Sequence, residues 1–105
     1  MANVVVYKER TNVVVVDLGI DVSSDTFESD IRDGKTTDDV LIAEWTIAFE
    51  TDGTDGLLRL TLDDSVTSLI TDSIGYMDLK RVTSGEPVPV FDKALKVEFR
   101  DVVTE

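Results

Sequence analysis

Apolar and polar residues alternate along several stretches of the chain, as they do in β-strands with one buried and one solvated face. The three clearest stretches are 41–50, 57–62 and 94–100. Their apolar positions are Leu41, Ala43, Trp45, Ile47, Phe49, Leu58, Leu60, Leu62, Leu95, Val97 and Phe99. Because Trp45 lies in the middle of the most regular pattern, we expect it to be buried beside Phe49, Leu60 and Leu79.

Four further stretches predict strands with less regular patterns. They are 3–7, 11–22, 25–32 and 74–82. In the second of these, the core-facing positions are expected to be Val14, Val16, Leu18 and Ile20. Polar residues, glycine and proline at 32–39 and 84–89 indicate loops between strands.

Only 63–71 has a helical pattern, with Val66, Leu69 and Ile70 spaced i, i+3 and i+4. Asp63 or Asp64 stands where a carboxylate can cap the free amides at the start of a helix. The chain is therefore expected to be a single all-β domain, 1–105. The strand and turn spacing favours a small antiparallel β-sandwich of six to eight short strands, or a small barrel, with one short helix near 63–71.

Composition excludes several kinds of chemistry. The 105 residues contain no cysteine and no histidine, which removes disulfides, thiolate ligands and the usual general base. The formal net charge is −12, and most of it lies in 17–64, which has 14 acidic residues and three basic ones. Such a surface repels phosphate backbones, so no nucleic-acid partner is expected. No apolar run is long enough for a membrane span, and the start lacks the features of a secretory signal.

The stretch ETDGTDG at 50–56 raises the question of a metal site. Asp52-Gly53 and Asp55-Gly56 are pairs that hairpin turns favour, because glycine adopts positive φ without strain. A helix–loop–helix calcium site would need alternating acidic ligands and a glutamate at its twelfth position. Counted from Asp52, the twelfth position is Asp63, and the flanking patterns are those of strands. We therefore predict a hairpin turn, and leave weak calcium binding as the open alternative.

No pattern typical of an enzyme occurs. The six glycines do not form a phosphate-binding loop, and no Ser-x-x-Lys or Gly-x-Ser-x-Gly spacing is found. A serine or threonine nucleophile would have to use a lysine or carboxylate as its base. We expect no catalytic, cofactor-binding or metal-binding residues.

Two valine-rich stretches, NVVVY at 3–7 and NVVVV at 12–16, carry apolar residues on both faces of a strand. One explanation is a pair of strands buried on both sides. The other is that the second face contacts another subunit, or that the first strand pairs with a partner chain. The candidate assembly interface consists of Val4, Val5, Val6, Tyr7, Val13 and Val15.

Four other stretches carry a family resemblance. They are DVSSDTFESDIRD (21–33), LRLTLDDSVTSLI (58–70), GYMDLKR (75–81) and ALKVEFRDVVT (94–104). Their order resembles the N-terminal β-sandwich domain of tailed-phage upper baseplate proteins and its short relatives among tail and fibre genes. The likeness covers roughly 12–104, and the two valine-rich strands at the start are not part of the pattern.

The resemblance implies a non-enzymatic bacteriophage structural protein, made in the host cytoplasm and built into the virion. Its partners would be other virion structural proteins, with multiple copies or a homo-oligomer in the particle. The preferred place is the tail or baseplate, joining the tail to fibres or neighbouring subunits. The alternative within this class is a head decoration or cement protein. From another class, the acidic segment suggests an inhibitor or DNA mimic.

Overall fold

The computed structural model describes residues 4–91 and 93–102, of which 49% lie in strands. In this part of the chain there are eleven strands and one short helix. They are β1 (Val4–Tyr7), β2 (Asn12–Asp17), β3 (Thr26–Glu28), β4 (Asp30–Arg32), β5 (Leu41–Glu44), β6 (Thr46–Phe49), β7 (Leu57–Leu62), α1 (Asp64–Thr67), β8 (Ile74–Met77), β9 (Lys80–Thr83), β10 (Glu86–Pro89) and β11 (Leu95–Arg100). The expectation of a mostly β chain with one short helix is confirmed, and the expected number of strands is too small.

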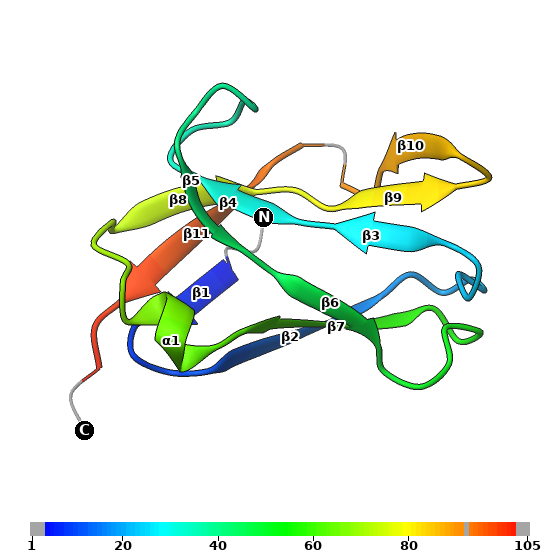
Figure 1. Ribbon diagram of the computed structural model, residues 1–105, viewed down its shortest axis with the longest axis horizontal. Coiled ribbons are helices and arrows are strands. Elements are labelled where there is room, and N and C mark those ends of the chain that lie inside the picture. The colour runs from blue at the N-terminus through cyan, green and yellow to red at the C-terminus, as the bar shows by residue number, and fades with distance from the viewer. Residues whose placement is uncertain (1–3, 92, 103–105) are drawn as a thin grey trace.

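The strands form three sheets that do not close into a barrel (Figure 1). Sheet A has the order β1-β11-β8-β4-β5, sheet B the order β2-β7-β6, and sheet C the order β10-β9-β3. The expectation of a purely antiparallel arrangement is wrong for sheet A, because β1 runs parallel to β11, with Val4 opposite Val97 and Tyr7 opposite Arg100. These two strands are the first and the last of the described chain, so no short hairpin joins them and their directions are not constrained to be opposite.

Three stretches predicted as single strands each divide between two sheets. The stretch 25–32 divides at Ser29, 41–50 at Trp45, and 74–82 at Asp78 and Leu79. The divisions lie together, because the Trp45 amide donates to the Ser29 carbonyl at 2.9 Å and the Ser29 hydroxyl donates to the Asp78 carbonyl. On one side of this junction the strands belong to sheet A, and beyond it they separate into sheets B and C. The alternation persists through each stretch, so the sequence pattern does not reveal the change of sheet.

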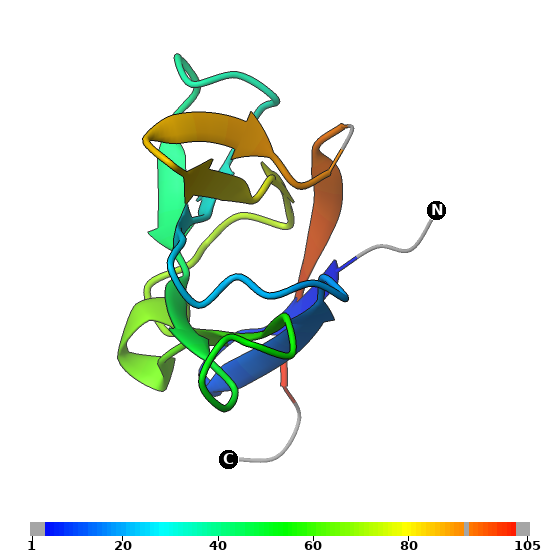
Figure 2. The same cartoon turned by 90° about the vertical axis from the view of Figure 1, so that its right-hand side faces the viewer.

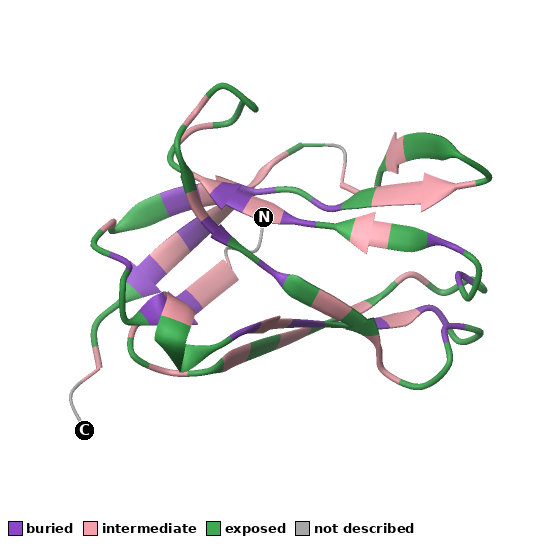
Figure 3. Cartoon of the chain, viewed as in Figure 1, coloured by how far each residue is buried: buried purple, intermediate pink, exposed green. Residues whose placement is uncertain are grey.

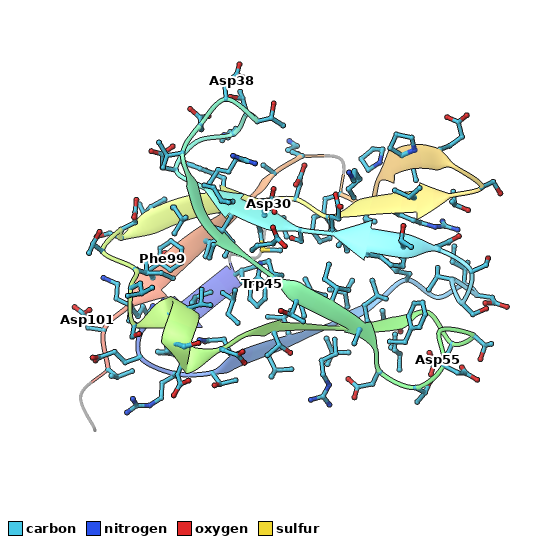
Figure 4. The ribbon with its side chains drawn as sticks, in the orientation of Figure 1. Asp30, Asp38, Trp45, Asp55, Phe99 and Asp101 are labelled. Atoms are coloured by element: carbon cyan, nitrogen blue, oxygen red, sulfur yellow. The ribbon has the colours of Figure 1, made fainter. Side chains whose placement is uncertain are left out.

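The core lies between sheet B and the other two sheets, around this junction (Figure 3). Trp45 is only 3% exposed and shares the core with Leu60 and Leu79, while Phe49 packs against it from a partly buried position. Trp45 lies near the middle of the molecule, whereas Asp38, Asp55 and Asp101 lie at its periphery (Figure 4). The predicted burial of Trp45 and of the apolar face of β7 is confirmed.

Three residues expected in the core are exposed instead. Leu41 is 46% exposed, because the register between β4 and β5 shifts after Ile31. Ile20 is 49% exposed, because β2 already ends at Asp17. Leu69 is 80% exposed, because α1 is a single turn that ends at Thr67.

The helix start and one predicted loop also differ from expectation. Asp63 occupies the N-cap position, but its side chain makes no capping hydrogen bond, and the Asp64 amide donates to the Thr11 hydroxyl instead. The stretch 84–89, expected to be a loop, forms a tight turn followed by β10. Ser84 and Gly85 have φ of 50° and 79° in this turn. The two prolines of β10 are accommodated because β10 is the outermost strand of sheet C.

Candidate functional site

The structure divides the six candidate interface residues among the core and two different surfaces. Val6 is completely buried and Val4 packs against the core, so the inclusion of Val6 in a surface interface is wrong. Alternation along β1 turns Val5 and Tyr7 to the opposite side of sheet A, where Tyr7 is 45% exposed and Val5 is partly buried. The two valine-rich strands do not pair with each other, because β1 belongs to sheet A and β2 to sheet B.

The remaining two candidates lie on β2. Val13 and Val15 are 47% and 51% exposed, while Val14 and Val16, which alternate with them, pack against the core. Val5 and Tyr7 therefore lie on the outer face of sheet A, and Val13 and Val15 lie on the outer face of sheet B. Each can be defined by the residues that stand opposite one another on neighbouring strands.

The outer face of sheet A extends across all five strands of that sheet. In one row Lys96 is opposite Tyr76, Tyr76 is opposite Arg32, and Arg32 is opposite Leu41. In the next two rows Val5 and Ile74 flank Glu98, and Tyr7 is opposite Arg100. On β4 and β5, Asp30 is opposite Glu44. The face thus comprises Val5, Tyr7, Asp30, Arg32, Leu41, Glu44, Ile74, Tyr76, Lys96, Glu98 and Arg100.

These eleven positions differ from the rest of the chain in composition. They hold both tyrosines of the protein. Their three cations and three anions cancel, and Arg32 pairs with Asp30 at 3.1 Å. Arg100 pairs with Glu98 at 2.9 Å, and hydrogen bonding to that carboxylate raises the pKa of Arg100. From the adjoining loop, the Lys35 ammonium lies 5.2 Å from the centre of the Tyr76 ring, a favourable cation–π contact.

The outer face of sheet B is smaller and carries no net charge. It comprises Val13, Val15, Asp17, Thr46, Ala48, Leu57, Arg59 and Thr61. Val13 and Thr46 both stand opposite Thr61, which places β-branched side chains in one row across three strands. Arg59 pairs with Glu50 at 2.6 Å, and hydrogen bonding to Glu50 raises the pKa of Arg59. This face is a flat surface of short apolar and hydroxyl side chains, which suits packing against another flat surface.

The ETDGTDG stretch connects β6 to β7, so the predicted hairpin connection is confirmed, although seven residues separate the strands. Gly53 and Gly56 both have positive φ and are buried against the loop that follows β2. The Gly53 and Gly56 carbonyls accept from the amides of Val22 and Leu18 at 2.8 and 2.9 Å. A side chain at either glycine would collide with that loop. The glycines therefore join two loops as well as turning the chain (Figure 2).

The aspartates of these two loops serve as hydrogen-bond acceptors within their own turns. Asp52 accepts from the amide and hydroxyl of Thr54, which lower its pKa, and Asp21 accepts in the same way from Ser23, with the same effect. Asp52 also lies close enough to Asp21 for repulsion to oppose that lowering at Asp21. Among residues 4–91 and 93–102, no three acidic side chains converge as a metal site would need.

A cleft of about 490 Å³ opens where β3 and β6 separate beyond the junction. It is lined by Asp25, Thr26, Phe27, Ile47, Ala48 and Phe49. The Phe27 and Phe49 rings meet edge to face with centres 6.5 Å apart. Asp25, which is 8% exposed, is bound by Arg81 at 2.6 Å, so its carboxylate is neutralised by a partner. The lining offers apolar contact and no nucleophile paired with a base.

The alternating pattern at 94–100 turns Lys96, Glu98 and Arg100 away from Leu95, Val97 and Phe99. It does not reveal the surface that these three residues form with Tyr76, Ile74 and Tyr7. Alternation shows that a residue points outward. It does not show which strands are neighbours, and here β11 lies between β1 and β8. Two tyrosines far apart in the sequence thereby reach the same face. Strand order is the missing information.

Comparison with protein-family models gives no match, and comparison with curated protein sequences gives none either. Within the described residues, no helix has the length and apolar character needed to cross a membrane.

Proposed function

We propose that this protein is a non-enzymatic structural component of a bacteriophage virion that works by packing against neighbouring subunits. The observation that carries the proposal is apolar exposure on two separate sheets. Val13 and Val15 are about half exposed on one, and Tyr7 and Ile74 on the other. Large apolar side chains grouped on a small domain mark surfaces that other proteins cover. Two such surfaces on one subunit suit a continuous assembly, in which each copy has more than one neighbour.

The tail or baseplate is the preferred place, and the order of elements supports it. The phage layout has a first strand, a strand ending in a short helix, a Gly-Tyr-x-Asp-Leu strand and a final strand. The four stretches that resemble it fall on β3 and β4, on β7 followed by α1, on β8, and on β11. The finer architecture proposed with it is a two-layer sandwich, with sheet B as one layer and sheets A and C as the other.

The other candidate functions are less well supported by the distribution of charge. A DNA mimic needs carboxylates arrayed on one face like the phosphates of a duplex. Here Asp21 and Asp52 are engaged in turns at one end of the molecule. A head decoration protein would use the same kind of packing, so it remains the alternative within the virion class.

The experiment is a comparison of particles assembled with wild-type protein and with the double variant Val5→Lys/Val13→Lys. Both side chains point outward, so the variant should fold, with a melting temperature close to that of wild type. We expect its copy number in purified particles, measured by quantitative mass spectrometry, to fall at least about tenfold, because lysine replaces an apolar contact. Cryo-electron microscopy of the wild-type particle would place the protein in tail or head.

The matched control is Val40→Lys, which makes the same change at a valine that is 67% exposed and belongs to neither face. This variant should enter particles normally. If purified particles contain no wild-type protein, the proposed function is wrong. If the double variant enters particles as well as the control does, the two faces are not the assembly surfaces.

A further inference from the structure

The facing edges of sheets B and C leave backbone groups without partners. β6 is hydrogen-bonded to β7 on one side only, and β3 is hydrogen-bonded to β9 on one side only. Beyond the junction the two strands diverge, and the cleft of about 490 Å³ lies between them (Figure 1). Among the described residues of 25–29 and 45–49, a single backbone hydrogen bond joins the two stretches, from the Trp45 amide to the Ser29 carbonyl.

The pairing of β6 with β7 shows which backbone groups face the cleft. The Glu50 amide donates to the Leu57 carbonyl at 3.0 Å. In an antiparallel pair, hydrogen-bonded positions alternate with positions whose N–H and C=O groups point to the other side of the strand. Ile47 and Phe49 are such positions, so their backbone groups point away from β7, as the Trp45 amide does. They have no hydrogen-bond partner among the described residues.

A free edge of this kind can be extended by a strand from another chain. Charged residues and proline commonly block such pairing, and β6 contains neither. The Phe27 and Phe49 rings line the cleft beside this edge. Because side chains alternate along a strand, every second side chain of an added strand would turn toward these rings. The edge therefore offers both backbone hydrogen bonds and apolar contact.

The charge around the cleft selects the kind of segment that fits. The two stretches that border it, 21–30 and 44–55, contain eight acidic residues and no basic one. Four of these acids pair with a lysine or an arginine: Asp25, Glu28, Asp30 and Glu50. The other four are exposed and have no basic partner in 4–91 and 93–102: Asp21, Glu44, Asp52 and Asp55.

The unpaired acids lie beyond both ends of β6. Glu44 comes just before Trp45, at the end where β3 and β6 meet. Asp52 and Asp21 lie near each other in the joined loops at the other end, close enough for repulsion between them. Complementary charges fix the orientation of a bound segment and favour its association. A segment with a cation on each side of its apolar residues matches this arrangement.

We propose that the free edge of β6 binds an extended segment of another protein, in which apolar and β-branched residues are flanked by lysine or arginine. The segment becomes a fourth strand of sheet B. It forms hydrogen bonds with the backbone of Ile47 and Phe49 and turns alternate side chains toward Phe27. This edge is separate from the outer faces invoked in the proposed function, and its binding does not require a virion.

The test is nuclear magnetic resonance of the isotope-labelled full chain with a blocked synthetic peptide, Lys-Val-Thr-Val-Thr-Val-Lys. We expect a dissociation constant below about 1 mM at low salt. At a tenfold excess of peptide over that constant, amide hydrogen exchange at Ile47 and Phe49 should slow by about tenfold. Exchange at Ala48 should not change, because its amide already points to β7.

Two peptide controls separate the contributions of charge and backbone. Replacing both lysines of the peptide with glutamate should weaken binding by about tenfold or more, because like charges then face each other. Replacing its central valine with proline should weaken binding too, because proline cannot donate a backbone hydrogen bond.

Protein variants test the same charges from the other side. Glu44→Gln/Asp52→Asn should weaken binding of the lysine peptide by about threefold or more at low salt. The matched control is Glu86→Gln, at an exposed acid of β10 that has no basic partner among the described residues. This control should bind the peptide as wild type does.

Three outcomes would overturn the proposal. The first is no binding of the lysine peptide at about 1 mM in low salt. The second is equal binding of the lysine and glutamate peptides, or slowed exchange at a strand edge other than β6. The third is a change in the Ile47 and Phe49 signals with protein concentration alone, which would assign the edge to a second copy of this chain.

Discussion

The outer faces of sheets A and B are built from the same alternating pattern and yet differ in chemistry. The face of sheet A combines tyrosine and isoleucine with six charged side chains, whereas the face of sheet B combines valine and threonine with one cation and one anion. Sheet A joins β1 and β11 from the two ends of the described chain. Sheet B pairs β2 with the hairpin that β6 and β7 form. Alternation decides which residues face outward, and strand order decides which of them become neighbours.

The difference predicts two kinds of contact. Association through a charged face depends on salt and on the partner's charge. Association through a flat valine and threonine face depends on buried apolar area and changes little with salt. A subunit with one surface of each kind can bind two different neighbours without confusing them.

The largest expected effect is on the free energy of unfolding, and it distinguishes the core side of β1 from its outer side. Val6→Lys should unfold the protein, because it places an unpaired ammonium among buried residues at a cost of several kcal/mol. Val5→Lys, one position earlier, should lower the free energy of unfolding by less than about 1 kcal/mol, because its side chain lies on the outer face. Urea unfolding followed by circular dichroism measures both. Equal losses in the two variants would mean that β1 has no distinct outer side.

Trp45 provides the next largest effect, because it sits where sheets A and B diverge. Trp45→Ala should cost about 3–5 kcal/mol and unfold much of the population of so small a domain. Trp45→Phe should cost much less, because the indole nitrogen has no hydrogen-bond partner among the described residues and phenylalanine removes it. Thermal unfolding of both variants gives the comparison. Emission typical of a solvated indole in the folded wild type would contradict the buried position.

How much of this structure could be predicted depends on how far apart in the sequence the interacting residues lie. The burial of Leu58, Leu60 and Leu62 follows from alternation within one short stretch. Trp45 was recognised as a core residue for the same reason. The division of its strand between two sheets was not recognised, because it depends on a hydrogen bond from Trp45 to Ser29, sixteen positions earlier. The sequence pattern near Trp45 is the same whether or not the strand changes sheet.

The candidate interface shows the same limit. Alternation placed Val5, Tyr7, Val13 and Val15 on the side away from the core, and all four lie there. Their assignment to one surface was wrong, since it assumed that consecutive strands stay in one sheet. Val6 was included with its neighbours in the valine-rich stretch, and the structure places it on the core side of β1, opposite Phe99.

A smaller effect concerns the acidic loop that connects β6 to β7. Hydrogen bonds from the Thr54 hydroxyl and amide hold the pKa of Asp52 below its ordinary value of 3.8. The unfolded chain therefore takes up the proton first. The stabilisation from this group is fully present above pH 3.8 and is lost as pH falls through the lower folded-state pKa. Between pH 6 and pH 3 the melting temperature of wild type should fall more than that of Asp52→Asn. Equal falls would mean that these hydrogen bonds do not favour the ionised carboxylate.

The smallest expected effect is the response to calcium, which should be none. The oxygens that a cation would need already accept hydrogen bonds, at 3.0 Å from the Thr54 amide to Asp52 and at 2.7 Å from the Thr51 hydroxyl to Asp55. A cation would have to displace these bonds and reorganise loops that two buried glycines hold together. Millimolar calcium should therefore leave the melting temperature equal to that in magnesium, since general screening of Asp21 and Asp52 is the same for both ions. A site occupied at a hundredfold excess over its dissociation constant would add about 2.7 kcal/mol. A rise in melting temperature with calcium alone would show that the loop is a metal site.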